Sequence, residues 1–395
     1  MQLGTRILRG IPRHTENTVA VVSLVLISLL PAIEVIARKF FKTGVHGSTG
    51  YVQHLVVWIT FVGGMITSRE GRHLHLSAGI GRIPQPYRRW IETWTACVST
   101  TVVSALAWSS LEFIRYGFGP GQTVGSVPIR AVMAIMPVGF GIMALRFIAH
   151  APRGRRHKLP ASSGLVIAAL LTWGIPDAVQ VLVWPISIAL IGSALLGAPI
   201  FVVLGGMAVV LFVNAGGIVA VIPNEAYTML TGPVIPTIPL FTLAGFLLSE
   251  SKAGERLVHA FRQCFGRLPG GLAIMAILVC AFFTTFTGAS GVTILALGGL
   301  LSYILVQGRY PEGFSHGLLT ASGSIGLLFP PSLPIILYGV VAHVNIKHMF
   351  IGGLIPGTLM IAVLALFGIK KMGGSAAPRP RADSGEILTA LRQSA

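Results

Sequence analysis

The sequence predicts an all-α polytopic membrane protein, in which a smooth four-helix bundle precedes a module of broken helices. Hydrophobic residues make up 53% of the 395 residues, and only 10% are charged, against about 25% in a typical soluble domain. The apolar residues also gather in runs of roughly 20, the length that crosses ~30 Å of hydrocarbon. These observations exclude a soluble enzyme and an intrinsically disordered chain.

Positive charge is the next constraint, because 29 Lys and Arg stand against 12 Asp and Glu. In a soluble protein this balance would suggest nucleic-acid binding. Here the basic residues lie in short connectors between apolar runs, which is typical of cytoplasmic loops of membrane proteins. We therefore expect membrane lipid, and no nucleic acid, around the chain. The cysteines Cys97, Cys264 and Cys280 are too few and too far apart to indicate disulfides or a zinc site.

Residues 1–150 are predicted to form the four-helix domain. The apolar runs 17–37, 52–68, 90–113 and 127–147 are each close to one bilayer span. Lys and Arg concentrate before the first run, after the second and after the fourth, which predicts a cytoplasmic N-terminus. The stretch 151–162 is basic, rich in turn-forming residues and non-periodic, and so predicts a cytoplasmic linker.

Residues 163–372 are predicted to form the second membrane module, followed by a polar tail at 373–395. Gly and Pro interrupt its apolar runs repeatedly. Irregular backbone at membrane depth is tolerated only where protein buries it or where it lines a water-filled cavity. The interruptions therefore favour a binding or conduction site. Between residues 162 and 217 the chain crosses the membrane either as one broken helix or as three short ones.

The segment 268–306 predicts a re-entrant helical hairpin. Two apolar arms meet at the small, uncharged break 288–291, and basic residues flank both outer ends. The arms would then enter and leave on the cytoplasmic face, with the tip inside the protein. The alternative is two full spans joined by a tight external turn.

Hydroxyl-bearing residues and glycines gather at this break and at a second one. The candidate Na⁺ and substrate ligands are Thr287, Gly288, Ser290, Gly291 and Thr293 at the tip, and Ser322, Gly323, Pro330, Pro331 and Ser332 at the second break. Neutral oxygens and freed carbonyls suit Na⁺ better than a transition metal. Helix N-termini in the same space would suit an anionic substrate.

The coupling ion follows from the position of the carboxylates. Asp and Glu lie near the ends of the apolar runs, so the sequence lacks the carboxylate ladder of a proton pump and favours Na⁺. It also lacks the motifs of hydrolases and ATP-binding loops. We expect a transporter rather than an enzyme, with no cofactor other than Na⁺ as the coupling ion.

An ordered set of motifs carries a family resemblance. The motifs are 238–246 (IPLFTLAGF), 266–273 (GRLPGGLA), 287–291 (TGASG), 328–339 (LFPPSLPIILYG) and 352–357 (GGLIPG). This set resembles the large membrane subunit of tripartite ATP-independent periplasmic (TRAP) transporters. Residues 1–150 are similar to the small subunit, with 71–74 (GRHL) near its usual motif, so the linker resembles a natural fusion of the two subunits.

The resemblance implies an elevator-type, Na⁺-coupled permease of the bacterial inner membrane. A periplasmic solute-binding protein would deliver an organic acid, commonly a C4-dicarboxylate or sialic acid. The segment 268–306 would be the first hairpin of the mobile part, and the small subunit would brace the static scaffold. At the tip, Gly291 stands where the family commonly has a second Ser, so the resemblance does not fix the number of ion ligands.

The resemblance covers only one of the family's two inverted repeats. After Lys370 the chain turns polar, so we expect the second repeat, and one wall of a site at the repeat interface, to be missing. Three interpretations follow. A separate chain supplies the missing half, two copies assemble, or the chain is a truncated, non-transporting membrane scaffold.

Overall fold

The computed structural model describes residues 13–76, 83–152, 154–174, 182–265, 268–288 and 290–371. These residues form helices, apart from connecting segments and one short β-hairpin. Six of the described helices are long and apolar enough to cross a membrane, or up to seven if a bent pair forms one span. The prediction of an all-α polytopic membrane protein is confirmed, whereas the re-entrant course of 268–306 and the single repeat stay predictions.

The chain divides into two compact units, which we call unit 1 (1–233) and unit 2 (234–395) and describe separately. The elements of unit 1 are α2 (Arg13–Phe41), α3 (Ser48–Glu70), α4 (Gln85–Tyr116), β1 (Thr123–Val124), β2 (Val127–Pro128), α5 (Ile129–Met133), α6 (Ile135–His150), α7 (Arg155–Ala169), a π-helical turn (Leu170–Gly174), α9 (Val183–Leu195), α10 (Ile200–Asn214) and α11 (Val221–Leu230). The first three predicted spans fall within α2, α3 and α4, and the fourth, 127–147, covers β2, α5 and most of α6.

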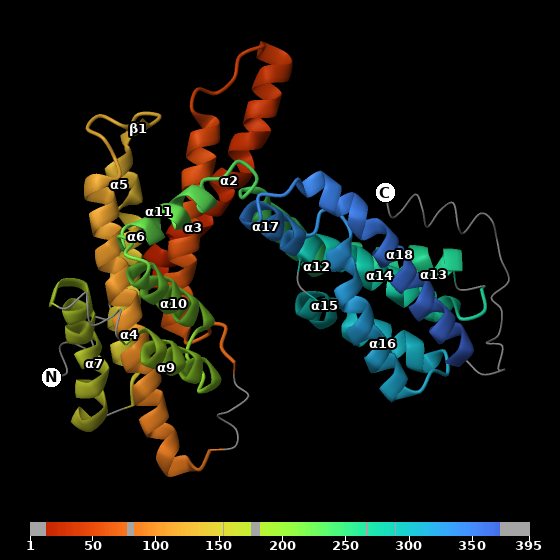
Figure 1. The fold of residues 1–395 in the computed structure, drawn as a ribbon. Coiled ribbons are helices and arrows are strands. Elements are labelled where there is room, and N and C mark those ends of the chain that lie inside the picture. Colours follow the sequence, from red (N-terminus) through yellow and green to blue (C-terminus); the bar gives the residue numbers. More distant parts are fainter. Residues whose placement is uncertain are drawn as a thin grey trace. The chain divides into compact units, whose positions relative to one another are not determined.

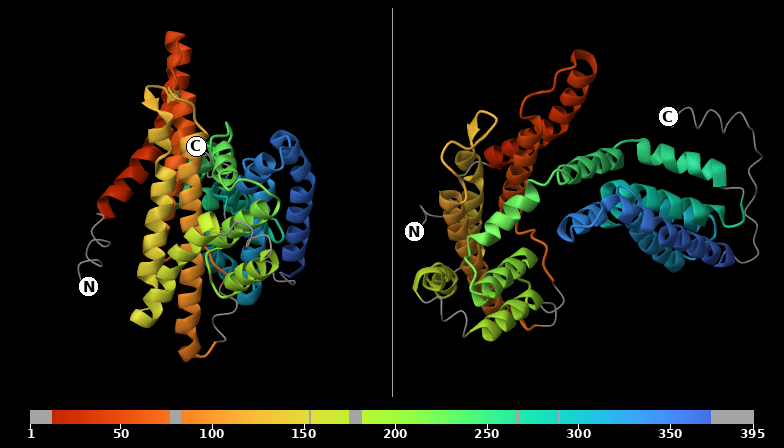
Figure 2. Two further views of the ribbon diagram at one scale, coloured as in Figure 1. Left: turned by 60° about the vertical axis from the view of Figure 1, so that its left-hand side comes forward. Right: turned by 45° about the horizontal axis from the view of Figure 1, so that its top comes forward.

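Unit 1 is built around α4. Figures 1 and 2 show α3, α4 and α6 running alongside one another, with the shorter α9 and α10 against them. Val57 of α3, Val103 of α4 and Val202 of α10 are fully buried in one continuous core. This shared core explains why unit 1 continues past the predicted linker. Most of 151–162 lies in α7, which packs against α4. The division into domains at residues 150, 162 and 372 stays a prediction.

The segment after α3 contacts both α6, in the predicted four-helix domain, and α10, which follows the predicted linker. Gly71 ends α3 in the left-handed conformation, with φ 65°. Beyond it, the Ile200 amide donates to the Leu74 carbonyl at 3.0 Å, at the start of α10. The His73 ring packs against Phe147 of α6 and Phe201 of α10. Burial, and secondarily the nearby His150, lowers the pKa of His73, so the imidazole is neutral at pH 7.

Unit 2 surrounds a central buried helix. Its elements are α12 (Thr237–Glu250), α13 (Ala253–Phe265), α14 (Gly271–Thr287), α15 (Ser290–Gln307), α16 (Glu312–Ile325), η3 (Gly326–Leu328), α17 (Leu333–Val341) and α18 (Ile346–Lys371). The central helix, α14, packs against α12, α13, α15, α16 and α18. Its Met275, Ile277 and Val279 are fully buried. The second break is evident, because the α16–η3 helix and α17 bend by 45° across residues 329–332.

Candidate functional site

The two breaks predicted from sequence meet in unit 2. Gly288 ends α14 in the left-handed conformation, with φ 66°, and its amide donates to the Thr284 carbonyl at 2.9 Å. A Cβ atom at Gly288 would lie 2.7 Å from Cγ of Leu333, the first residue of α17. The tip of the α14–α15 pair therefore touches the N-terminus of α17, directly after Ser332.

A cluster of buried hydroxyl groups lies at this junction. Thr293, in the first turn of α15, is completely buried. Its Oγ1 accepts a hydrogen bond from Thr284 Oγ1 at 2.9 Å and lies 3.1 Å from Thr287 Oγ1. We call Thr284, Thr287 and Thr293 the threonine cluster. Two of its members, Thr287 and Thr293, were predicted site residues, and the structure brings them together.

Two glycines that were not among the candidate residues allow other backbones to approach this cluster. A Cβ atom at Gly245 of α12 would lie 2.7 Å from Cα of Thr287, and one at Gly326 of η3 would lie 2.7 Å from Cβ of Thr284. The Gly326 carbonyl also accepts from Thr285 Oγ1 at 3.1 Å. An isolated Gly within an apolar helical run indicates such close approach, and both residues carried that signal.

Ser332 supplies the most informative polar atom of the junction. Its side chain is completely buried, it precedes the first residue of α17, and its hydroxyl has no hydrogen-bond partner among the described residues. An unsatisfied buried hydroxyl costs about 1–3 kcal/mol, so such groups call for a specific explanation. One such explanation is that the hydroxyl oxygen serves as a ligand for a cation.

The remaining predicted residues differ in what surrounds them. Gly323 packs close to Ser290, with 3.5 Å between its would-be Cβ and the Ser290 Cβ. The Ser322 hydroxyl donates to the Leu318 carbonyl of its own helix at 2.6 Å, and Gly291 is exposed and faces open space. The peptide bond between Pro330 and Pro331 is cis; Pro330 is exposed and Pro331 half-buried.

The junction combines two kinds of ligand group. The threonine cluster and Ser332 offer neutral oxygens, and the last carbonyls of α14 lie beyond the reach of its own amides. The N-termini of α15 and α17 lie close to this contact, because Gly288 touches Leu333, the first residue of α17, and α15 begins at Ser290. Free amide groups at a helix N-terminus favour anions. Such an arrangement can hold a weakly bound alkali cation beside the acidic group of a small organic anion.

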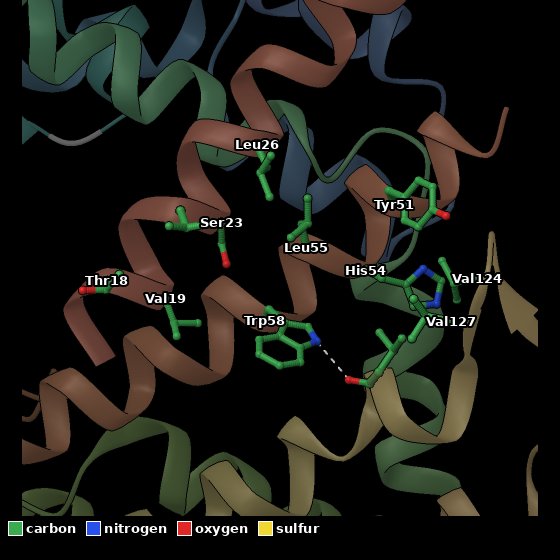
Figure 3. A pocket seen from close by; sticks show the side chains of 12 residues that line it. Thr18, Val19, Ser23, Leu26, Tyr51, His54, Leu55, Trp58, Val124 and Val127 are labelled. Atoms are coloured by element: carbon green, nitrogen blue, oxygen red, sulfur yellow. Dashed lines mark hydrogen bonds between the residues drawn. The ribbon is translucent and has the colours of Figure 1, made fainter. Parts of the chain in front are cut away.

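Unit 1 contains a cavity of about 440 Å³ between α2, α3 and the β1–β2 hairpin (Figure 3). Aliphatic side chains and Trp58 dominate its lining, and Trp58 Nε1 donates to the Val132 carbonyl at 2.9 Å. His54 also borders it, but its ring nitrogens already contact the Gly50 carbonyl and the Tyr227 hydroxyl, at 2.8 and 3.2 Å. This lining suits hydrocarbon rather than an organic anion.

Comparison with known families matches almost the whole of the chain. Residues 187–394 match the family described as the tripartite ATP-independent periplasmic transporter, DctM component. Residues 27–157 match the DctQ component of the same transporters.

Individual relatives are also permease proteins of TRAP transporters. The chain is 28% identical, over 83% of its own length and 53% of the relative's, to the isethionate TRAP transporter permease protein DctMQ of Oleidesulfovibrio alaskensis. It is 30% identical, over 43% of its length and 39% of the relative's, to the C4-dicarboxylate TRAP transporter large permease protein DctM of Pseudomonas aeruginosa. It is 23% identical, over 91% of its length and 62% of the relative's, to the sialic acid TRAP transporter permease protein SiaT of Haemophilus influenzae. The chain spans about half the length of the first two of these relatives or less.

Proposed function

Because this chain belongs to the tripartite ATP-independent periplasmic (TRAP) transporter family, with a small subunit fused to a large one, we propose that it forms the membrane component of a Na⁺-coupled importer of organic acids. It is a multi-pass inner-membrane protein of a transporter family, and not an enzyme. Family membership favours this function over that of a non-transporting scaffold. The bias of basic residues supports a cytoplasmic N-terminus.

The observation that carries the proposal is the buried hydroxyl of Ser332, which has no hydrogen-bond partner among the residues that the structure describes and lies beside the junction of the two breaks. We propose that Ser332 binds Na⁺ together with oxygens at the tip of the α14–α15 pair, including Ser290. Supporting this, the adjacent threonine cluster supplies neutral oxygens rather than carboxylates. Oxygen ligands without formal charge suit a partly dehydrated alkali cation that must be released again.

The proposed substrate is a small organic anion. The three relatives compared above are named for isethionate, C4-dicarboxylate and sialic acid, which all carry an acidic group. We propose that free amides at the N-termini of α15 and α17 bind that acidic group. A periplasmic solute-binding protein is the proposed donor of the substrate. We propose further that unit 2 is the moving part of an elevator mechanism and that unit 1 is static.

The test is uptake of a labelled C4-dicarboxylate, isethionate or sialic acid into proteoliposomes with an inward Na⁺ gradient and the cognate binding protein. The chain spans about half the length of its first-named relatives or less. It is therefore assayed by itself and also together with a polypeptide that carries the large-subunit residues following the matched part. We expect uptake by the chain alone or by the two-chain assembly, and we expect this uptake to require both Na⁺ and the binding protein. Uptake that is unchanged when K⁺ replaces Na⁺ would contradict the coupling.

The site itself is tested with Ser332→Ala and Ser290→Ala. Loss of one ligand oxygen worth about 1.4 kcal/mol raises the Na⁺ concentration for half-maximal uptake about tenfold. The control is Ser324→Ala, because the Ser324 hydroxyl is bonded to the Ala321 carbonyl of its own helix, at 2.9 Å. An unchanged Na⁺ dependence in folded Ser332→Ala protein would remove Ser332 from the site.

A further inference from the structure

One end of unit 2 brings together the ends of four helices. A Cβ atom at Gly270, which precedes α14, would lie 2.5 Å from Cγ1 of Ile369 near the end of α18. One at Gly308, directly after α15, would touch Leu272. The start of α16 joins them, because the rings of Phe314 and Phe367 are 5.7 Å apart. The beginnings of α14 and α16 and the ends of α15 and α18 are therefore neighbours.

Exposed basic side chains cover this end. Arg309 follows α15, and Lys370 and Lys371 close α18. Arg262 lies in the last turn of α13, whose C-terminal Phe265 carbonyl accepts from the Leu268 amide just before α14. We call Arg262, Arg309, Lys370 and Lys371 the basic end. None of the four forms an ion pair within the described part of the chain, although Glu255 and Glu312 lie on α13 and α16.

Exposed apolar and aromatic side chains, which we call the apolar band, lie next to the basic end on α18 and on α15. On α18, Leu366 and Phe367 are 65% and 55% exposed, one turn before Lys370. On α15, Tyr303 is 62% exposed and its hydroxyl accepts from Gln307 Nε2 at 2.6 Å. Apolar, then aromatic, then basic is the order in which a helix meets the hydrocarbon, the interface and the headgroups of a bilayer.

From this order and the unpaired positive charge, we propose that the basic end binds the phosphate group of an anionic phospholipid whose acyl chains lie along α15 and α18. The charge is complementary to the headgroup, and the exposed side chains of Tyr303, Leu366 and Phe367 are complementary to the chains. An acidic protein segment would use the basic residues but not the apolar band. This inference goes beyond the proposed transport function and does not depend on it.

The experiment measures phospholipid retained by the purified full chain, by native mass spectrometry after incubation with equimolar phosphatidylglycerol and phosphatidylcholine. The test variant is Arg309→Gln/Lys370→Gln/Lys371→Gln. The matched control is Lys347→Gln, which removes an exposed lysine from the opposite end of α18. Both variants keep the neighbouring apolar side chains, and thermal unfolding in detergent checks that both remain folded.

We expect the wild-type protein and Lys347→Gln to retain at least threefold more phosphatidylglycerol than phosphatidylcholine, and the triple variant to lose this preference. Equal retention of the two lipids by the wild type, or a preference that survives in a folded triple variant, would overturn the proposal. Displacement of phosphatidylglycerol by an equimolar amount of inorganic phosphate would also overturn it, because the acyl chains would then add nothing to the affinity. No transport is measured, so failure here leaves the proposed function standing.

Discussion

Two glycines three positions apart have opposite requirements at the tip of the α14–α15 pair. Gly288 combines φ 66° with a contact to Leu333 that leaves no room for a Cβ atom. Gly291 is exposed, has nothing within 4 Å of a would-be Cβ, and lies in the first turn of α15. Only the first position depends on the absence of a side chain.

We therefore expect Gly288→Ala to lower the stability of the protein by about 1–3 kcal/mol, because it combines left-handed strain with overpacking. Gly291→Ala should be neutral or stabilising by up to about 1 kcal/mol, as for Gly→Ala within a helix. Thermal unfolding midpoints in one detergent compare the two. Adding Leu333→Ala should restore part of the loss in Gly288→Ala, and a loss that Leu333→Ala leaves untouched would show that the contact is unimportant.

The sequence could predict the neighbourhood of this site but not the role of each residue. Gly288 and Gly291 belong to one short motif, and their difference arises because Leu333, 45 positions after Gly288, packs on one and not on the other. Ser322 and Ser332 differ partly for a local reason. Ser322 lies within α16 and bonds its own helix, whereas Ser332 follows two prolines at the break and has no partner among the described residues. A contact between segments distant in sequence, Gly288 with Leu333, decides the first case, and the position of each serine relative to the prolines contributes to the second.

At the scale of elements, a buried ionic network holds α2 against α3 and α6. The Glu16 carboxylate accepts from Arg69 Nη1 at 2.9 Å and from Arg146 Nη2, and Arg146 Nη1 donates to the Met65 carbonyl at 2.5 Å. Glu16 and Arg146 are both about 5% exposed. By position in the sequence, Arg146 would simply be a connector charge beside the linker, and it is instead buried between helices.

Breaking this network should be far more damaging than breaking an exposed pair. Arg146→Gln leaves a buried carboxylate with one partner fewer, which costs about 3–5 kcal/mol. The control is Arg38→Gln, which removes a 72% exposed side chain from its pair with Glu34 on α2 and costs at most about 1 kcal/mol. Thermal unfolding of the two variants measures the difference, and equal midpoints would mean that Glu16 and Arg146 do not anchor α2.

The spans were the easiest elements to predict. Runs of about 20 apolar residues directly encode α2, α3, α4 and α5–α6. The grouping of later helices was harder, because α9, α10 and α11 carry apolar surfaces that do not specify a partner. Their packing against α4 places the division between compact units after Pro233 rather than at the basic linker.

At the scale of the whole molecule, the junction between the two family matches lies inside unit 1. The helix at its start, α7, begins just before the first match ends at residue 157. It packs against α4, where His157 Nδ1 lies 2.8 Å from Thr93 Oγ1. Gly164 allows the close approach, because a Cβ atom there would lie 2.7 Å from the Cys97 carbonyl oxygen.

Cutting the chain just before α7 should therefore leave unit 1 assembled. With a protease site inserted between Pro152 and Gly154, the two fragments are expected to co-elute in size-exclusion chromatography after cleavage. The matched variant, Gly164→Val in the same background, forces α7 away from α4. A smaller share of its fragments should co-elute, because α9, α10 and α11 then hold the second fragment to α4 without α7. Separation without the Gly164 substitution would show that the peptide link, and not packing, holds the parts together.

The position of that junction also bears on how the protein is made. Where α4 and α7 meet in one folded unit, the covalent link adds no new interface, but it fixes the ratio of the two parts at one to one. It also replaces a search between two diffusing subunits in the bilayer with an intramolecular step at high effective concentration. Synthesis as a single chain thus lets the two parts associate during folding of one polypeptide instead of by encounter of separate subunits.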